Sequence, residues 1–143
     1  MNSADEEIKK LDSLNTKTTA VFNQQNHSDL KVLSYEKDSL ATIKLVDHRP
    51  NSIKYATANQ NSGFAVFSEM HYPKGWTATI DGEQTPHFRV NYALRGMQVP
   101  AGEHEIVFSF EPEVVRTGST IALASNILLG LLLLGGIAFT FRK

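Results

Sequence analysis

The chain has 143 residues, of which 41% are hydrophobic and 20% are charged, and its formal net charge is -1. This length fits one domain of ordinary size plus one further segment. The balanced charge argues against a nucleic-acid binder, which would need a basic surface. Because the chain has no cysteine, it has no disulfide, no thiol nucleophile and no cysteine-ligated metal.

The first expected element is a short amphipathic helix over residues 3–14. Ser3 and Glu6, three residues apart, form a capping-box pattern. Apolar residues recur at helical spacing, at Ile8, Leu11 and Leu14. The acidic first turn complements the helix dipole, and we interpret its charges as a solvated face.

From residue 18 to residue 110 the sequence predicts antiparallel strands, because β-branched and aromatic residues alternate with polar ones between turn residues. The expected strands cover residues 18–22, 32–36, 41–47, 52–58, 63–70, 77–80, 88–92, 95–99 and 104–110. Asp81-Gly82 is a type I′ hairpin dipeptide, and Pro100-Ala101-Gly102 reverses the chain before the last strand. Nine short strands favour a mainly β fold, an antiparallel β-sandwich of jelly-roll-like type.

Residues 117–141 carry no charge and read TGSTIALASNILLGLLLLGGIAFTF. About 20–24 helical residues span the roughly 30 Å hydrocarbon layer, so this run predicts a transmembrane helix and argues against a buried core helix. Arg142 and Lys143 favour the cytoplasmic side, which places residues 1–116 outside as an extracytoplasmic domain. Pro112 ends the last strand, so we expect this domain to lie close to the bilayer.

An outside domain must be exported, yet residues 1–7 have neither the basic nor the apolar region of a signal peptide. We therefore expect a piece of a longer membrane protein, with Met1 as an added initiator and earlier spans that carry the domain outward. A tail-anchored protein with a cytoplasmic domain is the alternative. It would send Arg142 and Lys143 across the membrane, against the usual bias.

The sequence indicates no complete catalytic or metal site. Five histidines lack the spacing of a metal site, namely His27, His48, His71, His87 and His104. Asp81, Glu83 and Glu69 are candidates for paired glycosidase carboxylates, but the hairpin turn explains Asp81 and solvation explains Glu83. Motifs for nucleophilic and nucleotide chemistry are missing. Asn26-His27-Ser28 matches the N-glycosylation pattern, which is frequent by chance, and we assign it no role.

A denser set of aromatic and hydrogen-bonding side chains is of the kind that stacks on sugars or polar headgroups and grips them. This candidate ligand surface consists of Tyr72, Trp76, Arg89, Asn91, Tyr92 and Arg95. The alternative is that Trp76 and the tyrosines fill the core, and for Trp76 we favour it. Arg89 and Arg95 are harder to bury.

Three runs of residues carry a family resemblance. Residues 66–82 read VFSEMHYPKGWTATIDG, residues 91–104 read NYALRGMQVPAGEH, and residues 110–112 read FEP. Together with DEEI at residues 5–8 and KTTAV at residues 17–21, they resemble the C-terminal region of bacterial YfhO-type multispanning membrane proteins. The resemblance continues into the last helix and covers essentially the whole chain.

The resemblance implies a parent similar to the GT-C class of glycosyltransferases, which take sugars from polyprenyl-phosphate donors on the outer face of the bacterial cytoplasmic membrane. The catalytic acid of that class lies in an early extracytoplasmic loop that no position here matches, so we expect no catalytic residue and no cofactor. The sandwich would help orient a glycan or lipid-linked substrate, with membrane lipid and the parent's other spans as partners. The alternative is a structural or protein-interaction module that braces the parent and binds no ligand.

Overall fold

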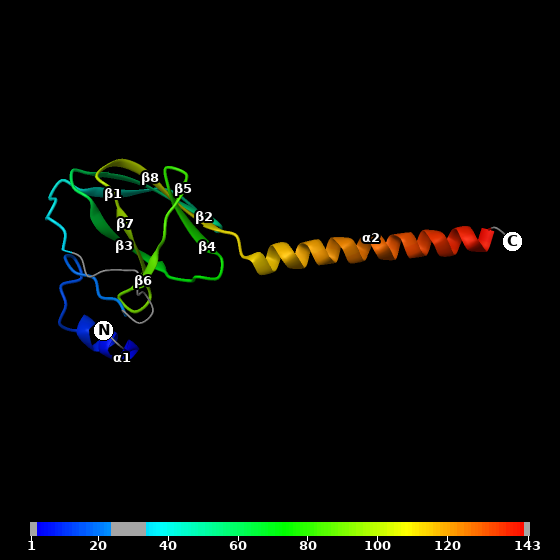
Figure 1. Ribbon diagram of the computed structural model, residues 1–143, viewed down its shortest axis with the longest axis horizontal. Helices are drawn as coiled ribbons and strands as arrows, with labels where there is room; N and C mark the ends of the chain where they lie inside the picture. The colour runs from blue at the N-terminus through cyan, green and yellow to red at the C-terminus, as the bar shows by residue number, and fades with distance from the viewer. Residues whose placement is uncertain (1–2, 24–33, 142–143) are drawn as a thin grey trace. The chain divides into compact units, whose positions relative to one another are not determined.

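The structure is a computed structural model that describes residues 3–23 and 34–141 (Figure 1). The chain forms two compact units, Met1–Phe110 and Glu111–Lys143. The first unit contains the helix α1 (Ala4–Leu11) and the strands β1 (Thr42–Arg49), β2 (Ser52–Asn59), β3 (Gly63–Met70), β4 (Trp76–Ile80), β5 (Glu83–Gln84), β6 (Phe88–Val90), β7 (Leu94–Val99) and β8 (Gly102–Phe110). The second unit contains the helix α2 (Glu113–Phe141).

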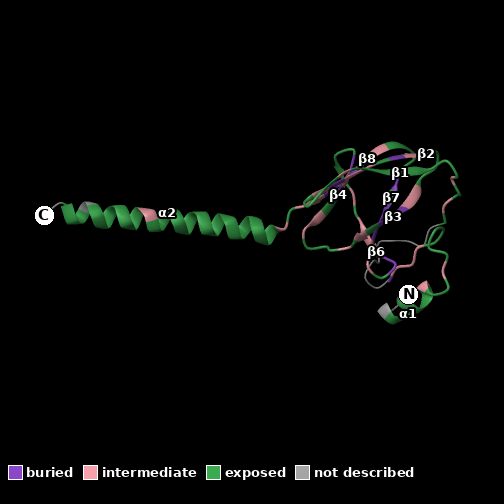
Figure 2. Ribbon diagram, turned by 180° about the vertical axis from the view of Figure 1, so that it is seen from behind, coloured by how far each residue is buried: buried purple, intermediate pink, exposed green. Residues whose placement is uncertain are grey.

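The strands form two antiparallel sheets, one of five strands in the order β1-β2-β8-β4-β5 and one of three in the order β3-β7-β6. The hydrophobic core contains residues of both sheets, namely Ile53, Ala65, Phe67, Ala78, Ile80, Met97, Val99, Ile106 and Phe108. At its centre the Phe67 and Phe108 rings meet edge to face, with centroids 5.0 Å apart. In β3 and β4 buried residues alternate with more exposed ones (Figure 2), and the two antiparallel sheets confirm the expected mainly β fold.

The expected N-terminal helix is present and is shorter than expected. Ser3 is its N-cap, and the Ser3 side chain accepts a hydrogen bond from the Glu6 backbone N–H at 3.2 Å. The helix ends at Leu11, three residues before residue 14. Here the Ser13 backbone N–H and hydroxyl both donate to the Lys10 carbonyl, which satisfies the last turn without a further helical residue.

The expected turn at Asp81-Gly82 joins β4 to β5. Asp81 has φ 52° and Gly82 has φ 87°, which are the positive values that a type I′ hairpin requires at both central positions. The reversal before the last strand is also present, and Gly102 at the start of β8 has φ 128°. Glycine suits this position because other residues rarely adopt such a backbone conformation.

The predicted strand over residues 18–22 is wrong. The Asn91 side chain accepts a hydrogen bond from the Val21 N–H at 2.9 Å, and the Asn91 N–H donates to the Val21 carbonyl at 2.8 Å. The backbone hydrogen bonds of Val21 therefore go to a single residue, Asn91, and not to a neighbouring strand. Residues 34–36 are not a strand either, and residues 32–33 lie outside the described residues, as does the Asn26-His27-Ser28 pattern.

The helix α2 includes the whole charge-free run and begins at Glu113, four residues before the expected start. The Pro112 carbonyl accepts hydrogen bonds from the Val115 and Arg116 backbone, so the first helical turn forms directly after the proline. The most apolar window of α2 has a mean hydropathy of 2.2, and the helix is long and apolar enough to cross a membrane. Two residues, Glu111 and Pro112, connect it to β8.

Candidate functional site

One end of the sandwich gathers aromatic and charged side chains from several strands. Because the strands are antiparallel, the end of β8 lies beside the start of β4, where Phe110 pairs with Trp76. In the other sheet the end of β3 lies beside the start of β7, where Arg95 pairs with Phe67. We call this group the exit-end cluster, because β8 leads from it toward α2. Its members are Tyr55, Glu69, Tyr72, Trp76, His87, Arg95, Phe108 and Phe110.

Arg95 lies at the centre of the exit-end cluster and is 1% exposed. Its guanidinium carbon lies 4.6 Å from the centroid of the Trp76 ring and 4.5 Å from that of Phe108, which are cation–π distances. Its Nη2 donates to the Met70 carbonyl at 3.0 Å, whereas Nε and Nη1 have no hydrogen-bond partner. Among the described residues no carboxylate forms an ion pair with Arg95. Its charge is therefore buried and only partly compensated.

A bulge in β3 shapes the surroundings of Arg95. The pairing of β3 with β7 shifts between Phe67 and Met70, and such bulges bend a strand and redirect its side chains. Glu69 lies in this irregular stretch, with its Oε1 3.8 Å from the His48 Nε2. Burial lowers the pKa of Arg95 from its ordinary value, and the charge of Glu69 opposes that change. Glu69 is thus an electrostatic partner of Arg95 that does not touch it.

Three aromatic rings extend from the surface to Arg95. We call Tyr72, Phe110 and Trp76 the aromatic row. The Tyr72 ring lies 6.4 Å from the Phe110 ring, and the Trp76 ring lies 5.1 Å from it. Tyr72 is 48% exposed, whereas Trp76 is half-buried against the core. The row therefore offers an accessible tyrosine at one end and a tryptophan stacked on a buried cation at the other.

His87 completes the cluster as a neutral group. Burial lowers the pKa of His87 from its ordinary value, and the nearby charge of Arg95 acts in the same direction. Its Nε2 lies 3.1 Å from the Trp76 carbonyl, which fits a neutral ring that donates from this nitrogen. Its buried Nδ1 has no hydrogen-bond partner. The cluster thus holds unpartnered polar atoms on two side chains.

The remaining residues of the candidate ligand surface are not members of the exit-end cluster. Asn91 and Tyr92 form the β6–β7 turn with φ values of 47° and 70°, and this turn holds the N-terminal segment. Besides the Asn91 bonds to residue 21, the Tyr92 N–H donates to the buried carboxylate of Glu7 at 2.7 Å. Arg89 is half-buried on β6, opposite Arg95 in the register. The structure thus brings together Tyr72, Trp76 and Arg95. Asn91 instead binds the N-terminal segment through its hydrogen bonds to Val21.

Sequence reasoning missed the burial of Arg95 and the contribution of the phenylalanines. Arg95, Met97 and Val99 alternate along β7 and are all buried, so strand periodicity already placed this arginine on the core face. Phe108 and Phe110 fall in the last expected strand, residues 104–110, and the strand pattern does not mark them as neighbours of a cation. The two aromatic faces allow the guanidinium to be buried, because they replace part of its hydration.

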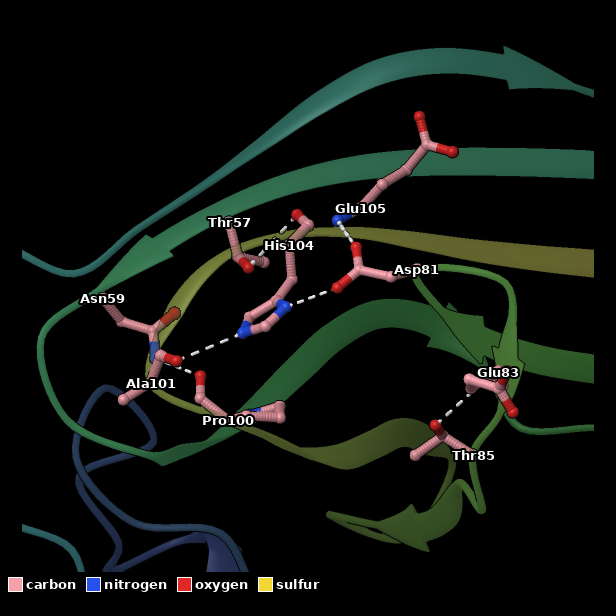
Figure 3. A network of polar contacts seen from close by, with 9 residues as sticks. All are labelled: Thr57, Asn59, Asp81, Glu83, Thr85, Pro100, Ala101, His104 and Glu105. Carbon is pink, nitrogen blue, oxygen red and sulfur yellow. Dashed lines mark hydrogen bonds and ion pairs between the residues drawn. The ribbon is translucent and has the colours of Figure 1, made fainter.

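A second polar network lies at the opposite end of the sandwich (Figure 3). The Asp81 carboxylate contacts the His104 Nδ1 at 2.6 Å and accepts a hydrogen bond from the Glu105 N–H at 2.8 Å. These contacts raise the pKa of His104 and lower that of Asp81. The other ring nitrogen of His104 lies 3.3 Å from the Ala101 carbonyl. Both ring nitrogens therefore have partners, and neither partner is a hydroxyl that could act as a nucleophile. The Asp81–His104 pair thus connects the β4–β5 turn to the turn between β7 and β8.

The described residues offer little support for other chemistry. Asp81 pairs with His104, whereas Glu69 pairs with His48, so these two of the three candidate glycosidase acids have separate partners. No group of three metal-ligating side chains occurs within residues 3–23 and 34–141. A cleft of about 870 Å³ lies between residues of the 16–22 and 34–38 segments and residues of β1 and β3. No member of the candidate ligand surface lines it.

A two-sheet β-sandwich followed by a helix long enough to cross a membrane is the architecture of a membrane-anchored domain. The family model described as bacterial membrane protein YfhO matches residues 10–122, and the chain belongs to this family. This match confirms the resemblance that the sequence motifs indicated and supports localisation in a membrane. No significant match was found among curated proteins or among solved structures.

Proposed function

We propose that this chain is the non-catalytic C-terminal extracytoplasmic domain and last transmembrane helix of a YfhO-family membrane glycosyltransferase that uses polyprenyl-phosphate sugars. Its role is to orient a glycan or lipid-linked substrate over a membrane-embedded active site. The observation that carries this proposal is the aromatic row, which ends on Arg95 and lies at the end of the sandwich that leads to α2.

The chemistry of the aromatic row suits such a ligand. Sugars present apolar C–H faces that stack on aromatic rings, and tyrosine adds a hydroxyl that forms hydrogen bonds. Behind Trp76, Arg95 supplies a positive charge without an ion-pair partner among the described acids. In a low-dielectric surrounding this charge favours an anionic group, such as a lipid phosphate, near the outer face of the ring.

The orientation of the domain is part of the proposal. Arg142 and Lys143 follow the charge-free run directly and favour a cytoplasmic C-terminal end. With one candidate span, the sandwich then lies on the outer face, where polyprenyl-phosphate donors of the GT-C class are used. A thiol-reactive probe that cannot cross membranes tests this in intact cells, because the chain has no cysteine of its own. Labelling of Glu103→Cys is expected from outside.

Binding to the full chain in lipid nanodiscs tests the ligand role. A fluorescent group on the ligand reports binding to the wild type and to the Trp76 variants alike, which is needed because Trp76 is the only tryptophan. We expect saturable binding of a polyprenyl-phosphate sugar or of glycans from an array. Trp76→Ala should lose at least about tenfold in affinity and Trp76→Phe should retain it, because stacking needs only an aromatic face.

The exposed Leu40, which lies outside the cluster, provides the control variant Leu40→Ala. This variant should bind as the wild type does. Polyprenyl phosphate without a sugar separates recognition of the sugar from recognition of the lipid. If the folded protein bound no member of this set, the ligand role would be excluded.

A second candidate function is a bracing module, which the edge strand β1 favours. Ile43 and Leu45 pair in register with Thr57 and Tyr55, on the face that is buried in β2, yet Leu45 is 55% exposed. Exposed apolar edges of this kind are typical of interaction surfaces. A photo-crosslinker at Leu45 should then capture another segment of the same membrane protein.

A further inference from the structure

The loop between β3 and β4 is the most apolar exposed part of the exit end. Met70 is 72% exposed, more than any other large hydrophobic residue described in the sandwich unit, and Tyr72 beside it is also exposed. The loop is held in place, because the His71 N–H donates to the Ala93 carbonyl at 2.7 Å. Lys74, at its tip, is exposed and forms no ion pair with the described acids.

The chain connection limits how far this loop can be from a membrane crossed by α2. Phe110 and Glu113 are three residues apart, so their Cα atoms are separated by at most about 11 Å. The charge-free run begins at Thr117, about 6 Å further along the helix. The headgroup layer adds roughly 5–8 Å on each side of the hydrocarbon. The Phe110 Cα therefore lies at most about 9–12 Å outside the headgroup layer. The Tyr72 ring is 6.4 Å from the Phe110 ring, so it lies near the membrane as well.

The two ends of the sandwich also differ in charge. The opposite end carries three exposed acids at or beside its turns, Asp81, Glu83 and Glu103, of which Asp81 pairs with His104. The exit end carries Lys74 and, directly after β8, the exposed Glu111, neither of which forms an ion pair with a described residue, whereas its Asp47 is neutralised by Arg49 at 2.9 Å. An anionic lipid surface would therefore attract Lys74 and repel the more acidic opposite end.

We propose that the loop of residues 70–75 is a bilayer contact site. Met70 and Tyr72 enter the boundary between headgroups and acyl chains, and the Lys74 ammonium lies against lipid phosphates. Tyrosine suits this depth because its ring is apolar and its hydroxyl remains hydrated. This contact fixes the distance of the exit-end cluster from the membrane, and it does not depend on the proposed substrate role.

Spin-label accessibility in the full chain tests this site. The chain has no cysteine, so Met70→Cys and Tyr72→Cys each give a single labelling position, and Glu83→Cys gives the matched control at the other end. The labelled proteins are placed in vesicles of phosphatidylethanolamine and phosphatidylglycerol. Collision of the nitroxide with oxygen, which concentrates in lipid, is compared with collision with a water-soluble nickel complex.

We expect the labels at 70 and 72 to be several-fold less accessible to nickel than the label at 83, and more accessible to oxygen. Lys74→Glu should raise the nickel accessibility at 72. If the labels at 70 and 72 were as accessible to nickel as the control, the site would be refuted. Protection from both nickel and oxygen would also refute it, because a protein surface would then cover the loop. The Trp76 fluorescence of each variant verifies that the sandwich is folded.

Discussion

Replacement of Arg95 by methionine should change the stability of the sandwich little, although Arg95 is almost completely buried. Two cation–π contacts contribute about 2 kcal/mol each in a desolvated site, and the charged hydrogen bond to Met70 contributes about 2 kcal/mol. Against this, the two unmade hydrogen bonds of Nε and Nη1 cost about 1–3 kcal/mol each, and the buried charge costs more. These contributions nearly cancel.

We therefore expect Arg95→Met to lie within about 2 kcal/mol of the wild type, because methionine fills a similar volume without a charge. Phe108→Ala, which empties a fully buried site beside it, should cost about 3–5 kcal/mol. Urea unfolding of the full chain in detergent, followed by Trp76 fluorescence, measures both. A loss above about 4 kcal/mol for Arg95→Met would refute this reasoning and make Arg95 a stability residue.

Three further predictions concern the rest of the sandwich. The hydrogen bond to Asp81 raises the pKa of His104 above its ordinary value of 6.5, so this pair should stabilise the protein fully below that pH and lose its effect as the pH rises through the folded pKa. His104→Gln should therefore lower the Tm more at about pH 5.5 than at about pH 9. Gly96→Ala should cost about 1–3 kcal/mol in urea unfolding, because a Cβ there would lie 2.6 Å from the Phe64 ring. Asn91→Ala should speed hydrogen exchange at the Val21 amide, since the Asn91 side chain is its acceptor.

Each of these predictions has a control and a contradicting result. Equal Tm differences at both pH values would show that protonation of His104 does not stabilise the fold. Gly63→Ala, where a Cβ meets nothing within 4 Å, should cost less than Gly96→Ala, and the reverse order would contradict the packing argument. Unchanged exchange at Val21 in Asn91→Ala would show that another group protects this amide.

Strands such as β2, β3 and β4 were predictable because each buries one face, and a half-buried strand shows its period of two directly. The two-residue strand β5 is fully exposed and was not expected. The segment 18–22 has the same local pattern, yet it pairs with the side chain of Asn91, some 70 residues away in the sequence. No local pattern distinguishes a neighbouring strand from a distant asparagine. The expected strand 88–92 is also shorter in the structure. It ends at Val90, because Asn91 and Tyr92 have positive φ values and form the turn.

The exit-end cluster was predictable only in part. The aromatic and cationic residue types singled out Tyr72, Trp76 and Arg95. In the structure Arg95 stacks on the Trp76 ring, and the Phe110 ring lies between Trp76 and Tyr72. The burial of Arg95 depends on Phe108 of β8 and on the Met70 carbonyl at the end of β3, which are contributions from distant segments. A rule that arginine is exposed fails here, because tertiary contacts replace its hydration.

Sugar-transfer kinetics test most directly the claim that the aromatic row positions a substrate without taking part in the chemistry. The measurement uses the full-length YfhO-family protein that contains these residues, with Trp76→Ala compared with Trp76→Phe. Our account predicts a raised KM for the lipid-linked substrate in Trp76→Ala, a kcat within about twofold of the wild type, and near-normal values for Trp76→Phe. An unchanged KM, or a lost kcat with KM retained, would contradict it.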